Sequence, residues 1–402
     1  MDIIKMAFKN LFRNSRRSLL TSLSLLVAGF VVVVLHGYVT GFLKGMKNNI
    51  INWMSGHITI AKEEYFSRKI FIPQEEYIEN LEEIEKKLKE FKYISFYTER
   101  LKSQGLIFKK DINKPVLIIG MDSEKEKKIL ELDKKIIKGI YELKEGALIG
   151  KELSRSLNLN VGDTIIIIAK TVLGGLNGIK IKINGIINAG FSEFDKRLVI
   201  ISISNMKKLL KMKEGAHEIV VLLKNENKIN DFIKKFKLNG ITARDYIQEL
   251  GTFSFYFKLA TNIYYFIYFL IILLATFTVI NTMTVAVFER LREIGTLKAI
   301  GMKDSEIFSL FGLEGIMLGT FGGVIGSILG WFTNIFLNLK GINVENIAKG
   351  MNIAIPYVIK FEANFHIVIF AIFLIIIICA IVSTIPALYA KKLSPQETLR
   401  QV

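Results

Sequence analysis

Four long apolar runs constrain this chain more than any other feature of its sequence. They cover residues 19–39, 263–287, 307–336 and 365–385. A helix needs about 20 mostly apolar residues to cross the hydrocarbon core of a bilayer, where its backbone polar groups can bond only to one another. The runs therefore predict four membrane-spanning helices.

The stretch between the first two runs is more polar and predicts a folded domain outside the bilayer. Runs rich in β-branched residues and bounded by Gly, Asn or Asp predict strands. These runs lie at 57–61, 105–109, 116–120, 164–169, 180–187, 198–203 and 219–223. Helical spacing of apolar residues predicts helices at 75–91, 152–157, 204–210 and 229–236. We expect a mixed α+β domain, with 219–223 and 229–236 in a second lobe.

Basic residues near both ends predict the orientation of the chain. Residues 3–17 place Ile4, Phe8, Leu11 and Phe12 on one helical face and basic residues around the rest, as in helices that lie on a membrane surface. The C-terminal tail is also basic. Because basic segments stay in the cytoplasm, both ends are expected there, in a multi-pass membrane protein. A cleavable signal peptide is the alternative for the first run, but no small-residue cleavage site follows it.

The net charge of +17 raises the question of nucleic acid binding. The lysines are scattered, and no basic aromatic motif accompanies them, so no nucleic-acid partner is expected. Attraction to anionic lipid head groups and to partner proteins is the simpler use of the charge.

No catalytic or cofactor-binding pattern is visible in the sequence. The nearest candidate for a phosphate loop, GALIGKE at 146–152, is one residue short of the required spacing and has Glu152 where a hydroxyl would hold magnesium. The histidines at 36, 57, 217 and 366 are not paired at ligand spacing, so no metal site is expected. The single cysteine, Cys379, cannot form an internal disulfide. We expect a chain that is not an enzyme and that draws its energy from a partner.

The segment FERLREIGTLKAIG at 288–301 joins the second and third runs and so must lie at a membrane face. In a helix, its apolar residues share one side: Leu291, Ile294, Leu297, Ala299 and Ile300. Its charged residues form the other side: Glu289, Arg290, Arg292, Glu293 and Lys298. Gly301 is expected to end this helix, and Asp304 or Ser305 to cap the next one. An ordinary solvated turn is the alternative.

The third run carries two ridges of glycine at four-residue spacing. The first is Gly315, Gly319 and Gly323, and the second is Gly322, Gly326 and Gly330. Such ridges let helix backbones approach closely, so they predict tight packing on neighbouring helices rather than mere flexibility. Glu314, in the same run, needs a partner in the bilayer. A basic residue of segment 288–301 is preferred to a role in proton relay.

Apolar stripes at helical spacing flank the predicted domain. One stripe follows the first run, at Phe42, Met46, Ile50 and Trp53, and the other precedes the second run, at Tyr246, Leu250, Phe253 and Phe257. They predict either paired stalk helices or the ordinary packing of each helix on the domain.

The segment between the second and third runs resembles the cytoplasmic coupling segment of the FtsX/MacB-like family of ABC transporter permeases. The matching residues are Glu289, Arg290, Arg292, Glu293, Ile294, Gly295, Leu297, Lys298, Ala299, Ile300 and Gly301. The resemblance implies that they dock on a separate ABC ATPase subunit. That subunit would hold the ATP and magnesium, and this chain would bind no cofactor. Two permeases, either two copies or this chain with a paralogue, would form the working unit.

The stretch 37–60, with Gly41, Phe42 and the string SGHITI from Ser55, resembles the lipoprotein-releasing (Lol-type) permeases. This resemblance implies extraction of lipoproteins from the inner membrane and their release to a periplasmic carrier. The candidate acyl-chain contacts lie on the stalk faces: Met46, Ile50, Phe253 and Phe257. A MacB-like efflux or export permease and an FtsX-like regulator of cell-wall hydrolases are the alternatives.

These patterns together predict one layout. In chain order it comprises a cytoplasmic interfacial helix (1–17), a membrane helix (18–40), an extracytoplasmic domain with flanking stalk helices (41–258), a membrane helix (259–288), the coupling segment (289–304), a membrane helix (305–337), an extracytoplasmic loop (338–364), a membrane helix (365–386) and a cytoplasmic tail (387–402). The fold class is a four-helix membrane region with a mixed α+β domain inserted between its first two helices.

Overall fold

The computed structural model describes residues 3–13, 15–109, 112–130, 132–249, 253–348 and 356–392. The chain forms two compact units. The helical unit contains Met1–Phe42, Phe257–Ile342 and Ile359–Val402, and the α/β unit contains Leu43–Tyr256 and Asn343–Val358.

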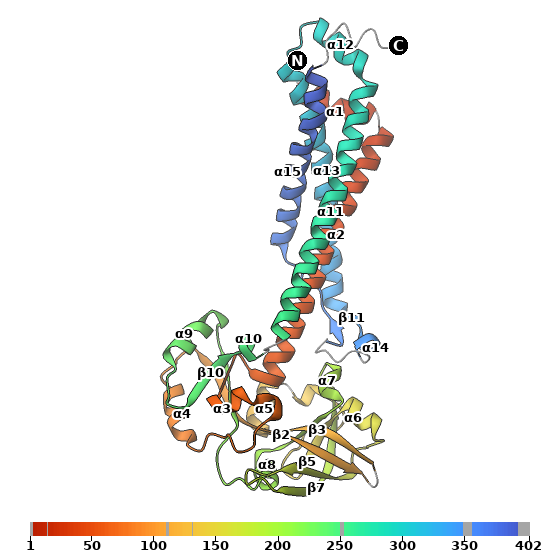
Figure 1. Ribbon diagram of the computed structural model, residues 1–402. Helices are drawn as coiled ribbons and strands as arrows, with labels where there is room; N and C mark the ends of the chain where they lie inside the picture. The colour runs from red at the N-terminus through yellow and green to blue at the C-terminus, as the bar shows by residue number, and fades with distance from the viewer. Residues whose placement is uncertain are drawn as a thin grey trace. The chain divides into compact units, whose positions relative to one another are not determined.

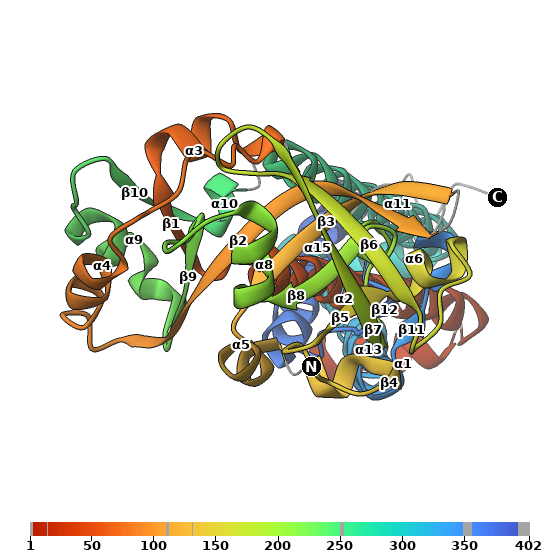
Figure 2. The ribbon, with the colours of Figure 1, turned by 90° about the horizontal axis from the view of Figure 1, so that it is seen from below.

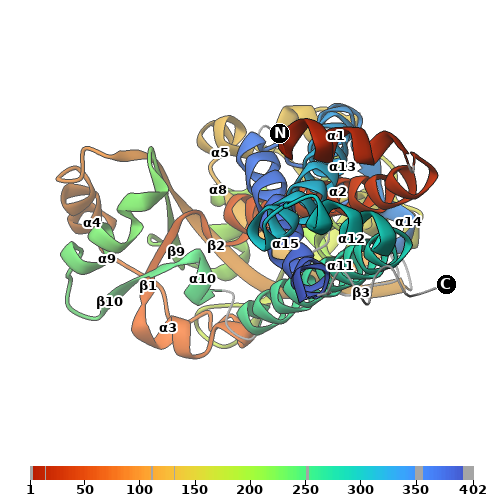
Figure 3. The same cartoon turned by 90° about the horizontal axis from the view of Figure 1, so that it is seen from above.

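Long helices dominate the helical unit, where α2, α11, α13 and α15 run side by side (Figure 1). Its helices are α1 (Ile3–Arg13), α2 (Ser15–Ile50), α11 (Phe253–Glu289), α12 (Leu291–Ala299), α13 (Asp304–Lys340) and α15 (Phe365–Lys392). Within the described ranges, four helices are long and apolar enough to cross a membrane, namely those at Ser15–Ser55, Thr261–Glu289, Asp304–Lys340 and Phe365–Tyr389. The four predicted membrane helices correspond to these. Figure 3 shows the unit end-on, with α1 beside the bundle.

The two glycine ridges of α13 face different neighbours. On the first ridge, Gly315 and Gly319 lie against Ser383 and Cys379 of α15. The second ridge, Gly322, Gly326 and Gly330, lies against the α2 backbone around Leu26 and Phe30. The small residues let three helices pack at close range, so α13 lies at the centre of this packing.

The α/β unit is built on one large sheet. Its described strands are β1 (Ile58–Lys62), β2 (Ile94–Lys109), β3 (Ile112–Met121), β4 (Ile136–Gly139), β5 (Gly146–Gly150), β6 (Thr164–Lys170), β7 (Leu176–Ile187), β8 (Leu198–Ser202), β9 (Glu218–Leu223) and β10 (Ile241–Asp245). The strand order is β10-β1-β9-β2-β3-β8-β5-β7-β4, and β6 pairs with both β2 and β7. Most pairs are antiparallel, but β3 and β8 are parallel, as are β5 and β7.

The unit has two lobes, with α4 and α9 in one and α6 and α8 in the other (Figure 2), and its sheet is accompanied by short helices. They are α3 (Glu63–Ser67), α4 (Leu81–Leu88), α5 (Ser123–Leu130), α6 (Lys151–Ser156), α7 (Ser192–Asp195), α8 (Ile203–Leu210), α9 (Ile229–Lys235), α10 (Tyr246–Glu249) and, from a later stretch of the chain, α14 (Glu345–Ala348). The short strands β11 (Ile342–Asn343) and β12 (Val358–Ile359) pair with each other.

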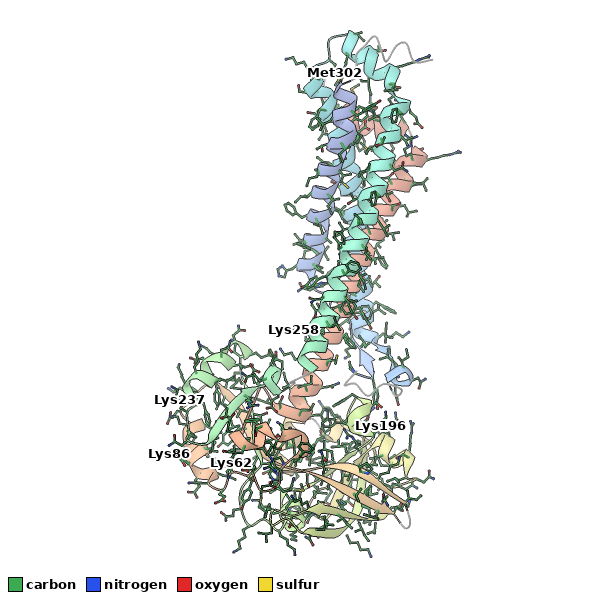
Figure 4. All side chains as sticks on the ribbon, viewed as in Figure 1. Lys62, Lys86, Lys196, Lys237, Lys258 and Met302 are labelled. Carbon is green, nitrogen blue, oxygen red and sulfur yellow. The ribbon has the colours of Figure 1, made fainter. Side chains whose placement is uncertain are left out.

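Each lobe has its own apolar core. The smaller lobe buries Ile58, Ile84, Val221 and Phe232 between β1, β9, α4 and α9. The larger lobe buries a cluster around Ile118, Ile167 and Leu209. Figure 4 shows Lys86 and Lys237 on the smaller lobe and Lys196 on the larger one. β2 runs through both lobes, because Ile94–Arg100 pairs with β9 and Arg100–Lys109 pairs with β3.

The sequence predicted the type of this unit correctly but missed several of its elements. The predicted strands at 164–169 and 198–203 correspond to β6 and β8. The predicted helix at 75–91 is too long, since α4 begins only at Leu81, where the Asn80 side chain accepts a hydrogen bond from the Glu83 backbone N–H at 3.3 Å. The strands β4, β5 and β10 were not predicted, because they are short and lack a clear alternation of apolar and polar residues.

Candidate coupling site

The segment that joins α11 to α13 folds as a short helix with a defined start and end. Arg290, with φ −109°, separates α11 from α12. Gly301 ends α12 with φ +102°, a left-handed conformation that favours glycine, as the sequence predicted. Its backbone N–H donates to Lys298 O at 3.0 Å, and the Met302 N–H donates to Leu297 O at 3.0 Å. Figure 4 marks Met302 in the loop between α12 and α13.

The start of α13 differs from the prediction. Neither Asp304 nor Ser305 caps it, because the helix already begins at Asp304. The Glu306 carboxylate instead accepts a hydrogen bond from the Lys303 backbone N–H at 2.8 Å. Asp304 pairs with Lys298 at 2.9 Å, so the two ends of the loop are tied together.

One face of α12 packs into the helical unit, and the other is open. Ile294 and Gly295 are buried, whereas Arg292 and Glu293 are exposed. Ala299 and Ile300 were predicted on the apolar face, yet both are exposed, and 79% of Ile300 is accessible. The helix ends there, so these residues leave the packed face.

Arg290 was predicted among the charged residues on the side of the segment opposite its apolar residues, but it is buried. Only 6% of the residue is exposed. Its Nη1 donates to Glu314 Oε1 at 2.8 Å, and its Nη2 donates to the backbone O of Asn10 at 3.2 Å. The Asn10 Nδ2 also donates to Glu314 Oε1, at 2.6 Å. A basic residue of the segment is thus the partner of Glu314, and α1 contributes the third member of the group.

Two further ion pairs connect α12 and the end of α11 to the N-terminal region. Arg13 pairs with Glu293, and Arg17 pairs with Glu289. Sequence reasoning missed these two ion pairs, although a signal was present. The two arginines are four residues apart in the sequence, and so are the two glutamates. Leu11, predicted on the membrane-facing side of α1, instead packs into the bundle core, while Phe8 and Phe12 are exposed.

The predicted acyl-chain contacts lie in less accessible places. Met46 and Ile50 are buried, with 7% and 2% of their surface exposed. The side chains of Phe253 and Phe257, the stripe residue Leu250 and the tail beyond Lys392 lie outside the described residues. The role of the four contacts therefore stays a prediction.

The segment GALIGKE, considered above as a phosphate loop, is a buried strand that leads directly into α6. Gly146–Gly150 form β5, and the Lys151 Nζ donates to Glu345 Oε1 at 2.5 Å. Within the described ranges, no group of three or more His, Cys, Asp or Glu side chains is placed to hold a metal ion.

Two family profiles together cover most of the chain. The FtsX-like permease C-terminal profile matches residues 265–395, and the MacB-like periplasmic core domain profile matches residues 18–237. The chain belongs to the FtsX/MacB-like family of ABC transporter permeases. A permease of this family is a membrane subunit and is generally not catalytic itself.

Curated relatives extend the similarity over most of the permease. The lipoprotein-releasing system transmembrane protein LolC of Xylella fastidiosa is 24% identical, over 72% of this chain and 73% of its own length. LolC of Buchnera aphidicola is 26% identical, over 91% of this chain and 89% of its own. An uncharacterized ABC transporter permease of Methanocaldococcus jannaschii is 24% identical, over 99% of this chain and 98% of its own length.

Proposed function

We propose that this permease works with a separate ATPase subunit to extract lipoproteins from the bacterial inner membrane and release them to a periplasmic carrier. The similarity to LolC proteins over most of the chain supports the choice of substrate. In this proposal both ends and α12 are cytoplasmic, and the α/β unit lies outside. A second copy of the chain or a paralogue completes the transporter.

The observation that carries the proposal is the way α12 is held. Its inner face is anchored by Ile294 and by the buried contact of Arg290 with Glu314, while Arg292 and Ile300 stay open to a partner. A short helix fixed in this way can follow the closure of an ATPase dimer and pass the displacement to α13 and α1. The ATPase binds the ATP and magnesium, and this chain transmits the displacement.

Reconstitution is the direct test of this function. The permease would be purified with the ATPase that accompanies it and placed in proteoliposomes with a fluorescent triacylated lipoprotein. We expect release into solution that depends on ATP hydrolysis and on a periplasmic lipoprotein carrier. A non-hydrolysable ATP analogue is the control.

The alternatives predict different results in the same preparation. A MacB-like export permease would hydrolyse ATP and move a substrate in the presence of an adaptor, leaving the lipoprotein in place. An FtsX-like regulator would activate a cell-wall hydrolase and release nothing. Hydrolysis of ATP without lipoprotein release would therefore contradict the proposed substrate.

A further inference from the structure

A network of buried charges lies inside the α/β unit. Its fully or almost fully buried members are Arg100, Lys102, Glu126 and Glu218. Taking such charges out of water is costly, and replacing a buried ion pair by apolar residues is often neutral or stabilising. A stabilising role alone therefore explains this network poorly, and the segments that it connects indicate a different role.

Its first branch holds the end of the helix that begins in the helical unit as α2. A π-helical turn, η1 (Ile51–Ser55), continues α2 and ends at Gly56, with φ +63°. The last carbonyls of a helix have no partner within it. Here Arg100 donates to the carbonyls of Asn52 and Trp53 at 3.0 and 3.3 Å, and the Lys102 Nζ donates to that of Met54 at 2.8 Å.

Both cations come from the central strand β2 and are themselves fixed. Glu126 of α5 accepts from the Arg100 Nε and Nη2 at 2.5 and 2.8 Å. Glu218, at the start of β9, accepts from the Lys102 Nζ at 2.5 Å. The final turn of the helix is thus attached to the strand that joins the two lobes.

Its second branch runs from the same carboxylate toward α11. The other oxygen of Glu218 lies 2.8 Å from the Lys69 Nζ and accepts from the Tyr65 hydroxyl at 3.0 Å. Lys69 also pairs with Glu249, the last residue of α10, and the next helix along the chain is α11. One buried carboxylate therefore connects the chain leaving α2 with the chain leading into α11.

The charge on Glu218 is held in place by its neighbours. Burial would raise the pKa of this carboxyl, but Lys102 and Lys69 outweigh that effect and keep the pKa well below its ordinary value. Glu218 stays ionised at any physiological pH, whereas burial lowers the pKa of Lys102 to about 8, so the charge on Lys102 is the one that is lost as the pH rises above that value.

We infer that Lys69, Lys102, Glu218 and Glu249, called here the Glu218 junction, transmit the movement of α2 and α11 to β9 and to β2, the strand that runs through both lobes. The inference rests on the proposed function for the source of that movement. Lys69 and Lys102 act as positioning residues. Lys69 connects Glu249, the last residue of α10, to Glu218 of β9. Lys102, which lies in β2, connects the end of η1 at Met54 to the same carboxylate.

The test uses the full permease in its complex with the ATPase, in proteoliposomes. Lys102→Met breaks the link to Met54, and Lys69→Met breaks the link to Glu249. Each variant leaves Glu218 paired with the other lysine and with Tyr65. The matched control is Lys235→Met, since Lys235 is 64% exposed and pairs with Asp231 at 2.8 Å on the surface of the same unit.

We expect both junction variants to hydrolyse ATP at the wild-type rate and to release about tenfold less lipoprotein per ATP, within the usual range of coupling between sites. Lys235→Met should behave as wild type. Lys69→Arg keeps the charge and the donors, so it should restore release.

A second readout does not depend on the substrate. Spin labels at Lys182 and Lys237, on the two lobes of a Cys379→Ala protein, report whether nucleotide changes their distance. The junction variants should lose most of that change while the melting temperature of the complex stays at the wild-type value. If Lys102→Met lowers the melting temperature, Lys69→Met carries the test, because Lys69 is partly exposed.

The two readouts separate the two proposals. The wild-type protein could change the distance between the labels with nucleotide yet release no lipoprotein. That result would contradict lipoprotein as the substrate, and the distance measurements on the two lysine variants would still test the junction. Wild-type distance changes and wild-type release in both lysine variants would overturn the junction.

Discussion

At the scale of single residues, the two buried arginines show how this chain uses charge away from water. Arg290 and Arg100 each face a carboxylate and at least one backbone carbonyl. Arg100 makes four such hydrogen bonds, whereas Arg290 makes two and its buried Nε has no hydrogen-bond partner. Such groups are stabilised only as complete sets, because removing one partner leaves an unpaired buried charge.

This argument gives a prediction for the pair formed by Arg290 and Glu314. Arg290→Met and Glu314→Leu should each destabilise the permease by about 3–5 kcal/mol, whereas the double variant should cost much less than the sum. Thermal unfolding of the detergent-solubilised protein measures this. The exposed pair of Arg13 and Glu293 is the control, and Arg13→Met should cost less than about 1 kcal/mol. Strict additivity of the two buried substitutions would contradict the account.

At the scale of elements, α13 is the helix on which its neighbours pack. Its glycines bring α2 to one side and α15 to another, and its Glu314 holds Arg290 at the start of α12. Under the proposed function, a displacement of α12 would reach α13 through this ion pair and would reach α2 through the backbone contact between α13 and α2.

Alanine substitution at two glycines of α13 tests this packing. Glycine to alanine within a helix ordinarily stabilises by roughly 0.5–1 kcal/mol. Gly312→Ala should follow that rule, since a Cβ there meets nothing within 4 Å. Gly326→Ala should do the opposite, because its Cβ would meet the backbone of Leu26, with the Cα only 2.8 Å away. Opposite shifts in melting temperature are expected, and equal shifts would exclude close packing at Gly326.

At the scale of the whole molecule, the two described joints lie in different units. One is the anchored helix α12, and the other is the Glu218 junction. The helix α2 contributes to both units, from Ser15 to Ile50. Under the proposed function, a displacement caused by an ATPase at α12 would change the α/β unit only if both α12 and the Glu218 junction stay intact.

Charge reversal at Arg292 tests the first joint for the whole complex. Arg292 is exposed, whereas Glu293 also holds Arg13, so Arg292→Glu is the more specific change. Like charges placed together across an interface cost several kcal/mol, and each 1.4 kcal/mol is about tenfold in affinity. We expect at least a tenfold weaker association with the ATPase, measured by co-purification and by ATP turnover. Arg16→Glu, the same change at an exposed site in the first turn of α2, should leave both unchanged.

The sequence was most informative where structure depends on local pattern. Apolar length predicted the four long helices, and a single glycine at 301 predicted the end of α12. The burial of Arg290 was not predicted, because helical periodicity groups it with the other charges of the segment, and its partners Glu314 and Asn10 come from distant parts of the chain.

The Glu218 junction was missed for a related reason, although one signal was available. Arg100 and Lys102 are two residues apart, so both point to the same face of β2. Charged residues at alternate positions of a buried strand suggest a buried partner. The partner of Lys102, Glu218, could not be found without knowing that β9 lies beside β2.

The long strand β2 makes the two lobes one folding unit. Arg100 marks the point where its pairing passes from β9 to β3, so neither lobe can complete its sheet if the chain is divided there. Calorimetry of the α/β region should therefore give a single cooperative transition, with neither lobe melting ahead of the other. Proteolysis at a loop of the smaller lobe should accordingly loosen the larger one as well.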